Sequence, residues 1–162
     1  MAFRMDVSGM AELIHKLEQL GEKAQDAASL ALYEGARVVA DAVSGAVENI
    51  ATKRLKYPAP PGKQRMPSPE EKAVLMGAKH GVAKFRKGIT KVDTSVGYQN
   101  SGYGQINGKT VPVPLIANAI NSGTSFMKKQ PFMRKAFSTS QGAAEAAIES
   151  KLIEELNKLG LE

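Results

Sequence analysis

The chain has 162 residues and no cysteine, which excludes disulfide bonds, thiol nucleophiles and thiolate metal sites. It carries 22 Lys and Arg against 16 Asp and Glu, a net charge of +6. No apolar run approaches the roughly 20 residues that a membrane helix needs, and the N-terminus lacks an apolar signal core. We therefore expect one domain over residues 1–162 that is soluble, is made in the cytoplasm and has no membrane contact.

Positive charge is concentrated in one segment. Residues 53–91 carry 11 Lys and Arg but only two acids, so this segment has a charge of +9 and the rest of the chain −3. A local excess of this kind attracts phosphates or an acidic protein surface. A solvated basic loop is the alternative interpretation.

The first predicted elements are a short strand and two helices. Apolar residues alternate with polar ones over 3–8, which predicts a strand with one buried face. Apolar residues spaced by three and four predict a helix over 9–21. Alanines and valines recur every three to four residues over 23–54 without a proline, which predicts a long helix. Gly35 and Gly45 weaken that helix, each by roughly 1 kcal/mol relative to Ala.

Proline interrupts this pattern in the middle of the chain. Residues 56–71 hold five of the eight prolines. Because proline fixes φ and lacks an N–H, neither a helix nor a central strand is expected there. We predict a proline-rich basic loop at about 55–81. Within it, Ser68, Pro69 and Glu71 have the spacing of a capping box, which predicts a short helix.

Strands and two further helices are predicted in the second half. Mixed apolar and basic residues over 82–98 predict one or two strands. The Asn-Gly-Lys sequence at 107–109 is typical of a hairpin turn, and an edge strand follows because its prolines exclude a central position. A short helix is predicted over 114–123. The last helix is predicted over 131–159, with its proline at the first helical position.

This order of elements predicts the fold class. Strands that are grouped between long helices are typical of an α+β fold. We expect an antiparallel sheet of about four strands packed against two long helices, with short additional helices and the proline-rich loop.

The sequence offers no pattern for catalysis or for a metal. His15 and His80 have neither a Cys nor a carboxylate at metal-ligand spacing. Asp6, Asp41 and Asp93 are scattered, and no phosphate-binding loop or hydrolase motif occurs. We therefore predict no enzyme activity and no catalytic, cofactor or metal site.

Sequence-specific nucleic-acid binding is not expected either. The basic segment contains only Tyr57 and Phe85 as aromatic residues, which is fewer than a stacking surface needs. No helix-turn-helix or zinc-finger pattern is present. Non-specific contact with a phosphate backbone remains an open interpretation.

Residues 121–137, "NSGTSFMKKQPFMRKAF", gather three phenylalanines around one turn and one proline. We expect Gly123 to end a helix and Thr124 to bond the local backbone. Phe132 and Phe137 would pin the last helix to the sheet. An ordinary core joint between two helices is one interpretation of this segment, and a joint that also lies at a subunit interface is the other.

Several segments resemble the small tail-component or tail-completion (head–tail joining) proteins of long-tailed bacteriophages. The start, "MDVSGMAELIHKLEQL" at 5–20, is similar to a strand that leads through a Gly into an amphipathic helix in that family. The second half resembles it more specifically, with a strand ending in Val-Gly at 96–97 and Gly-Thr-Ser at 123–125. Pro-Phe at 131–132 and Ala136 complete that pattern. Two features depart from the family pattern. Position 121 is Asn where family members carry an acid, and many members are shorter where this chain has the proline-rich insert.

The resemblance implies a structural virion protein. Such a protein lies in the tail or at the head–tail junction, is made in the host cytoplasm, and forms a ring of identical subunits, a hexamer being one option. Its partners would be neighbouring connector, tail-tube or tail-terminator proteins, with non-specific contact to packaged DNA. The alternatives from the residues alone are a small basic non-specific DNA-binding protein and a generic interaction protein.

The basic segment and the 121–137 segment provide the candidate contact residues. We expect 53–91 to face either a DNA-filled lumen or an adjacent ring. The candidates for a subunit interface or a DNA-lumen contact are Lys63, Arg65, Lys84, Arg86, Lys128, Lys129 and Phe132.

Overall fold

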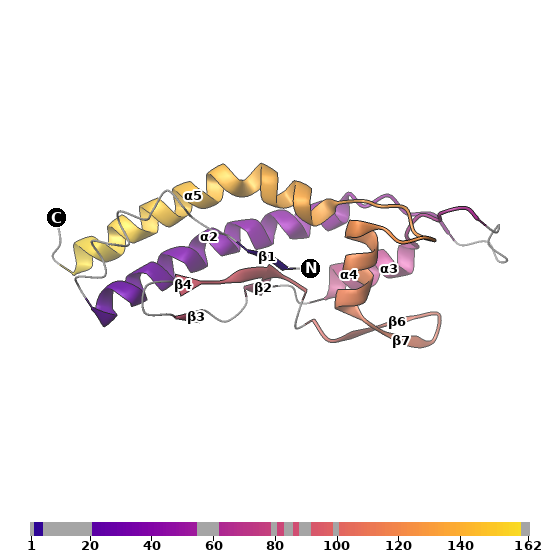
Figure 1. Cartoon of the computed structure of the whole chain (residues 1–162), viewed down its shortest axis with the longest axis horizontal. Helices are drawn as coiled ribbons and strands as arrows, with labels where there is room; N and C mark the ends of the chain where they lie inside the picture. Colours follow the sequence, from indigo (N-terminus) through magenta and orange to yellow (C-terminus); the bar gives the residue numbers. More distant parts are fainter. Residues whose placement is uncertain are drawn as a thin grey trace.

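The computed structural model of the chain is shown in Figure 1. The residues it describes are 2–4, 21–54, 62–78, 81–82, 86–87, 92–98 and 101–159. The helix predicted over 9–21, both histidines and the proline-rich stretch 56–61 lie outside these residues. Of the first predicted strand, the described part is β1 (Ala2–Arg4).

Two long helices form the main body of the molecule and confirm that part of the prediction. α2 (Glu22–Glu48) and α5 (Phe132–Lys158) have 27 residues each and lie side by side in opposite directions (Figure 1). Small side chains on α2 let the two backbones approach closely. At one end of the pair a small apolar cluster joins them, made of Ala24, Ala27, Ala31, Ile148 and Leu152.

The larger core lies at the other end of the helix pair. There, valines of α2 meet the start of α5, the short helix α4 (Val113–Ser122) and the residues that follow the sheet. Its largest fully buried side chains are Val39, Val43, Val47, Leu75, Tyr98, Val113, Ile120 and Met133. Met133, Ala136 and Ala144 of α5 lie in this core, so the buried residues of this helix recur every three to eight residues along one face.

α2 ends six residues earlier than Arg54, the predicted end. The Lys72 ammonium donates hydrogen bonds to the carbonyl oxygens of Glu48 (2.6 Å) and Ile50 (3.2 Å), which lie at this end. A cation at a helix C-terminus complements the helix dipole and satisfies carbonyls that have no partner within the helix. The following residues bond segments that lie far away in the sequence: the Lys53 N–H donates to the Pro67 carbonyl at 2.9 Å, and the Ala51 backbone bonds the Gln130 side chain.

Gly35 and Gly45 have different roles in α2, although the sequence treats them alike. A Cβ added at Gly35 would lie 2.6 Å from Ile148 Cδ1 and 3.1 Å from the carbonyl oxygen of Ala144 on α5. Nothing lies within 4 Å of a Cβ at Gly45. Gly35 thus marks the close approach of the two helices, whereas Gly45 faces open space.

We expect opposite effects of alanine at these two positions. Gly35→Ala should lower the free energy of unfolding by about 1–2 kcal/mol, because the added methyl overpacks the contact with α5. Gly45→Ala should raise it by about 0.5–1 kcal/mol through helix propensity alone. Urea denaturation followed by circular dichroism measures both. Equal stabilisation by the two changes would show that the helices separate easily at Gly35.

The strands confirm an α+β fold, but the described residues do not form one sheet of about four strands. β1, β5 (Ser95–Gly97) and β2 (Gly81–Val82) form an antiparallel three-stranded sheet in that order. β3 (Arg86–Lys87) and β4 (Val92–Asp93) form a separate antiparallel pair. The pairing register differs by one residue between the β2–β5 and β3–β4 ladders, which divides the predicted strands into short pieces. The three-stranded sheet contacts α2.

Two predictions about local structure, a capped helix and a hairpin turn, are confirmed. The predicted proline-rich loop contains α3 (Pro69–Gly77), whose capping box is complete: the Ser68 hydroxyl accepts from the Glu71 N–H at 3.1 Å, and the Glu71 carboxylate accepts from the Ser68 N–H at 2.7 Å. The hairpin β6 (Tyr103–Ile106) and β7 (Lys109–Pro112) turns at Asn107 and Gly108, both with positive φ. A two-residue hairpin turn of this kind needs positive φ at both positions, and Asn-Gly is the pair that favours it.

Candidate functional site

The 121–137 segment, called the joint below, connects α4 to α5 by a closely bonded turn. Gly123 has φ 77°, and its N–H donates to the Ala119 carbonyl at 2.9 Å. The Thr124 hydroxyl accepts from the N–H groups of Phe126 (3.3 Å) and Met127 (2.9 Å). The predicted helix end and the predicted Thr124 bond to the local backbone are therefore confirmed, and the turn has one defined path.

The start of α5 is capped by a residue of α4. Pro131 occupies the N-cap position, one place earlier than predicted, and offers no side-chain acceptor. Instead, the buried Asn121 carboxamide oxygen accepts from the Met133 N–H at 3.1 Å. An amide accepts this bond without placing a net charge in the core. A polar residue on the apolar face of α4 was the sequence signal for this role, and sequence reasoning missed it.

Two segments remote in the sequence join the same turn. The Gln130 side chain bonds the backbone of Ala51 in both directions: its Oε1 accepts from the Ala51 N–H at 2.9 Å, and its Nε2 donates to the Ala51 carbonyl at 2.8 Å. Arg65 pairs with Met127 in a parallel bridge, in which its N–H donates to Phe126 and its carbonyl accepts from Lys128, both at 2.8 Å. The joint therefore fixes the chain after α2 and the chain before α3.

Arg65, a predicted lumen or interface cation, is used inside the subunit. Its guanidinium makes two parallel hydrogen bonds to the Glu71 carboxylate, at 2.7 and 2.6 Å. Burial alone would raise the pKa of Glu71, but the bonds from Arg65 and the Ser68 N–H outweigh it and hold the pKa below its ordinary value. The Arg65–Glu71 pair thus fixes the segment before α3 to the joint.

The three phenylalanines have three different environments. Phe132 is buried, and its ring meets Tyr98 edge-on with ring centroids 6.4 Å apart. Phe137 is half-buried against the core, whereas Phe126 is 61% exposed. Phe132 therefore pins α5 to the chain just after β5, next to the sheet contact predicted for it. As a candidate interface residue, however, Phe132 offers no exposed side chain within the subunit.

Tyr98 makes the packing around Phe132 sensitive to alkali. Burial raises the pKa of Tyr98 to about 12, from an ordinary 10. The folded state therefore keeps the phenol proton more tightly than the unfolded state does, and stability that is present below pH 10 is lost as the pH rises towards about 12. The expected loss is on the order of 2–3 kcal/mol.

Tyrosinate absorbance provides the measurement for Tyr98, since the chain has no Trp to obscure it. We expect one tyrosine to ionise late, together with unfolding, and this step to be missing from Tyr98→Phe. The Phe variant should also lose the extra decline in stability above pH 10. A late step that persists in the variant would assign it to another tyrosine.

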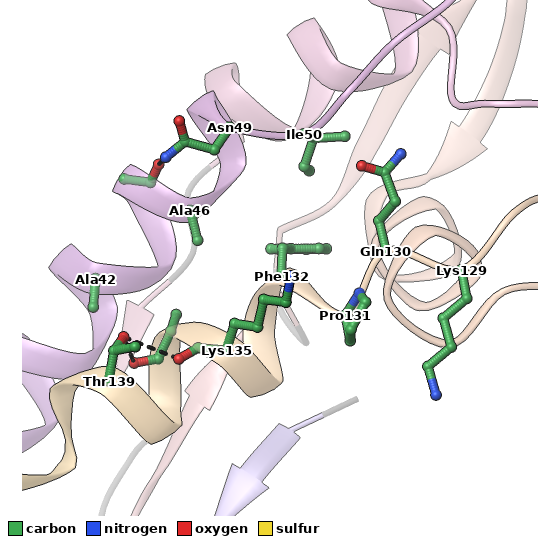
Figure 2. Close-up of a pocket in the computed structure, with 12 residues that line it drawn as sticks. Ala42, Ala46, Asn49, Ile50, Lys129, Gln130, Pro131, Phe132, Lys135 and Thr139 are labelled. Atoms are coloured by element: carbon green, nitrogen blue, oxygen red, sulfur yellow. Dashed lines mark hydrogen bonds between the residues drawn. The ribbon is translucent and has the colours of Figure 1, made fainter.

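A groove lies beside the joint, between the end of α2 and the start of α5 (Figure 2). Its volume is about 560 Å³. Its lining is mostly small or apolar, with Ala42, Gly45 and Ala46 from α2 and Ala136 from α5. The other lining residues are Asn49, Ile50, Lys129, Gln130, Pro131, Phe132, Lys135 and Thr139.

The remaining candidate cations are only partly brought together. Lys128 and Lys129 are exposed on the joint, as predicted, and Lys129 lines the groove. Lys63 is exposed on the segment before α3. Lys84 and the side chain of Arg86 lie outside the described part of the chain. The sequence did not single out Lys135, whose place in the groove depends on the packing of α2 against α5.

Comparisons with protein-family models, curated proteins and solved structures find no match to this chain. Among the described residues, no three His, Asp or Glu side chains gather as a metal site would require. Within the same ranges, no helix is both long and apolar enough to cross a membrane. The joint and its groove are the candidate site because they bring segments remote in the sequence together beside a groove.

Proposed function

We propose that this chain is a non-enzymatic structural protein of a bacteriophage virion that completes the tail or joins it to the head. It works as a ring of identical subunits, with neighbouring connector, tail-tube or tail-terminator proteins as partners. It uses no cofactor or metal.

The joint is the observation that carries this proposal. The segments that resemble the phage family, Gly-Thr-Ser at 123–125 and Pro-Phe at 131–132, form one hydrogen-bonded turn. Bonds from Arg65 and Gln130 attach two remote segments to that turn. A rigid joint with exposed lysines suits a subunit contact, because contact surfaces bind best when they are ordered before binding.

Electron microscopy of phage particles that lack this protein tests the proposal. We expect either tails that are complete but unattached to heads or tails that fail to terminate, and rescue by the wild-type chain supplied from a plasmid. Antibody labelling of wild-type particles should place the chain at the head–tail junction or the tail end. Normal infectious particles without the chain would contradict a structural role in the virion.

Non-specific DNA binding is the second candidate, and exposed cations near the joint favour it. A duplex-binding protein that contacts several phosphates loses affinity steeply with salt, by a factor of about 10³–10⁵ between 50 and 200 mM for 6–10 contacts. Titration of the free subunit with a labelled duplex at two salt concentrations measures this. Micromolar binding with a steep salt dependence would favour the second candidate over the first.

A further inference from the structure

One end of the molecule is basic, and its cations are not matched by acids. The end that holds the joint comprises 51–54, 62–78 and 113–138, and these ranges contain nine Lys and Arg against two Glu. Arg65 and Lys72 bond groups within the subunit. The other seven are exposed, and none of them forms an ion pair within the described part of the chain: Lys53, Arg54, Lys63, Lys128, Lys129, Arg134 and Lys135.

The start of α5 adds to this positive potential. Its first turn contains no acid, and Arg134 and Lys135 follow directly. Cations at a helix N-terminus oppose the helix dipole, and an anion there is stabilised. α3 shows the ordinary arrangement, with Glu70 and Glu71 in its first turn. The groove beside α5 thus combines an apolar floor with an unmatched positive rim that includes Lys129 and Lys135.

The opposite end of the same molecule is acidic and exposes apolar side chains. Residues 22–34 and 143–159 together have a charge of −4. They lie at the far end of the helix pair, where α2 begins and α5 ends (Figure 1). Large apolar side chains are exposed there too: Leu30 (47%), Tyr33 (45%) and Ile153 (51%).

A single ridge of α5 fits the groove in both charge and polarity. Glu149 and Ile153 are exposed and four residues apart, so they lie on one face of the helix. The Ile153 side chain would cover the Ala and Gly floor of the groove. The Glu149 carboxylate would lie near the lysines of its rim. Phosphates would neutralise the lysines but leave the apolar floor uncovered, so the observations favour a protein surface over a duplex.

We propose that the groove and the exposed cations around it bind the acidic end of a second copy of this chain, head to tail. This inference rests on the proposed ring and specifies which surfaces form it. A head-to-tail contact joins two different patches, so an open assembly keeps one free patch of each kind until the ring closes.

Two double variants test this contact from both sides. Lys129→Glu/Lys135→Glu reverses the rim of the groove, and the change at Lys135 also improves the first turn of α5, so a loss of assembly is not a loss of folding. Glu145→Lys/Glu149→Lys replaces two exposed carboxylates of the acidic end by cations and cancels its net charge of −4. Lys109→Glu is the control, a charge reversal at an exposed site on the β6–β7 hairpin, outside both surfaces. Sedimentation measures self-association of the purified chains at low and high salt.

We expect wild-type self-association that weakens with salt, and a dissociation constant at least about tenfold weaker in each double variant. The control should behave as wild type. An equal mixture of the two double variants should restore association, because the unchanged groove of one variant meets the unchanged acidic end of the other, and the reversed rim meets a ridge reversed to match it. This restoration on mixing is the outcome that a general charge effect would not produce.

Several outcomes would overturn the head-to-tail contact. These are a wild-type chain that stays monomeric at low salt up to its solubility limit, variants that associate as wild type, and a mixture that does not restore association. If the groove variant loses duplex binding but keeps self-association, the groove binds DNA instead. Rings in particles carrying either variant would overturn the contact and leave the structural role intact.

Discussion

Phe132→Ala is expected to lower the free energy of unfolding by about 3–5 kcal/mol, the usual cost of truncating a buried Phe. The Phe132 ring is 4% exposed and contacts Tyr98 edge-on, so its removal leaves a cavity where α5 meets the chain after β5. Urea denaturation followed by circular dichroism gives the value. Phe126→Ala, in the same joint but with a 61% exposed side chain, should change stability by less than about 0.5 kcal/mol.

A milder variant separates folding from assembly. Phe132→Leu should stay folded, since a volume-reducing swap between apolar residues leaves a smaller cavity. If the joint also forms part of a subunit contact, this variant should assemble less well than its stability predicts. Normal assembly of the folded Leu variant would show that Phe132 serves the core alone.

Glu71→Ala is expected to cost on the order of 2–4 kcal/mol, somewhat less than the loss of a fully buried ion pair, because Arg65 is partly exposed. The change leaves the Arg65 guanidinium without its carboxylate and the Ser68 N–H without its acceptor. It also removes half of the capping box of α3. Glu70→Ala is the matched control, since Glu70 is adjacent, exposed and also in the first turn of α3.

The contribution of Glu71 to the free energy of unfolding should disappear in acid. Its pKa is lowered in the folded state, so the folded state binds this proton less readily than the unfolded state does. The stabilisation is therefore fully present above the ordinary carboxyl pKa of 4.5 and is lost as the pH falls through the lower, folded value. Wild type and Glu71→Gln should converge in stability at low pH. A difference that stays constant with pH would assign the effect to shape rather than charge.

The features that the sequence predicted well depend on residues close together in the chain. The capping box at Ser68, the Asn-Gly turn and the helix end at Gly123 each need only a few neighbours. The two long helices were predictable because their apolar period continues over many turns. Helix ends were less predictable, since α2 ends beside Lys72, a residue 24 positions beyond Glu48.

The candidate site was less predictable because its bonds connect distant segments. Gln130 bonds Ala51 across 79 residues, and Asn121 caps a helix that begins after the turn. Arg65 counted as one more cation in a basic stretch, yet its bonds are made to Glu71 and the joint. Charge counting cannot distinguish an internal cation from an exposed one, because that difference depends on packing.

The close contact of α2 with α5 also determines when the protein can fold. Gly35 meets Ile148, so a close contact between the helices joins residues 113 positions apart. Contacts this far apart form slowly, because closing so long a loop costs entropy before the contact can stabilise it. On the ribosome, the Ala and Val face of α2 must therefore wait for its cover until residues 132–158 have emerged. A chain that is interrupted before them would leave the part of α2 that packs on α5 without its cover.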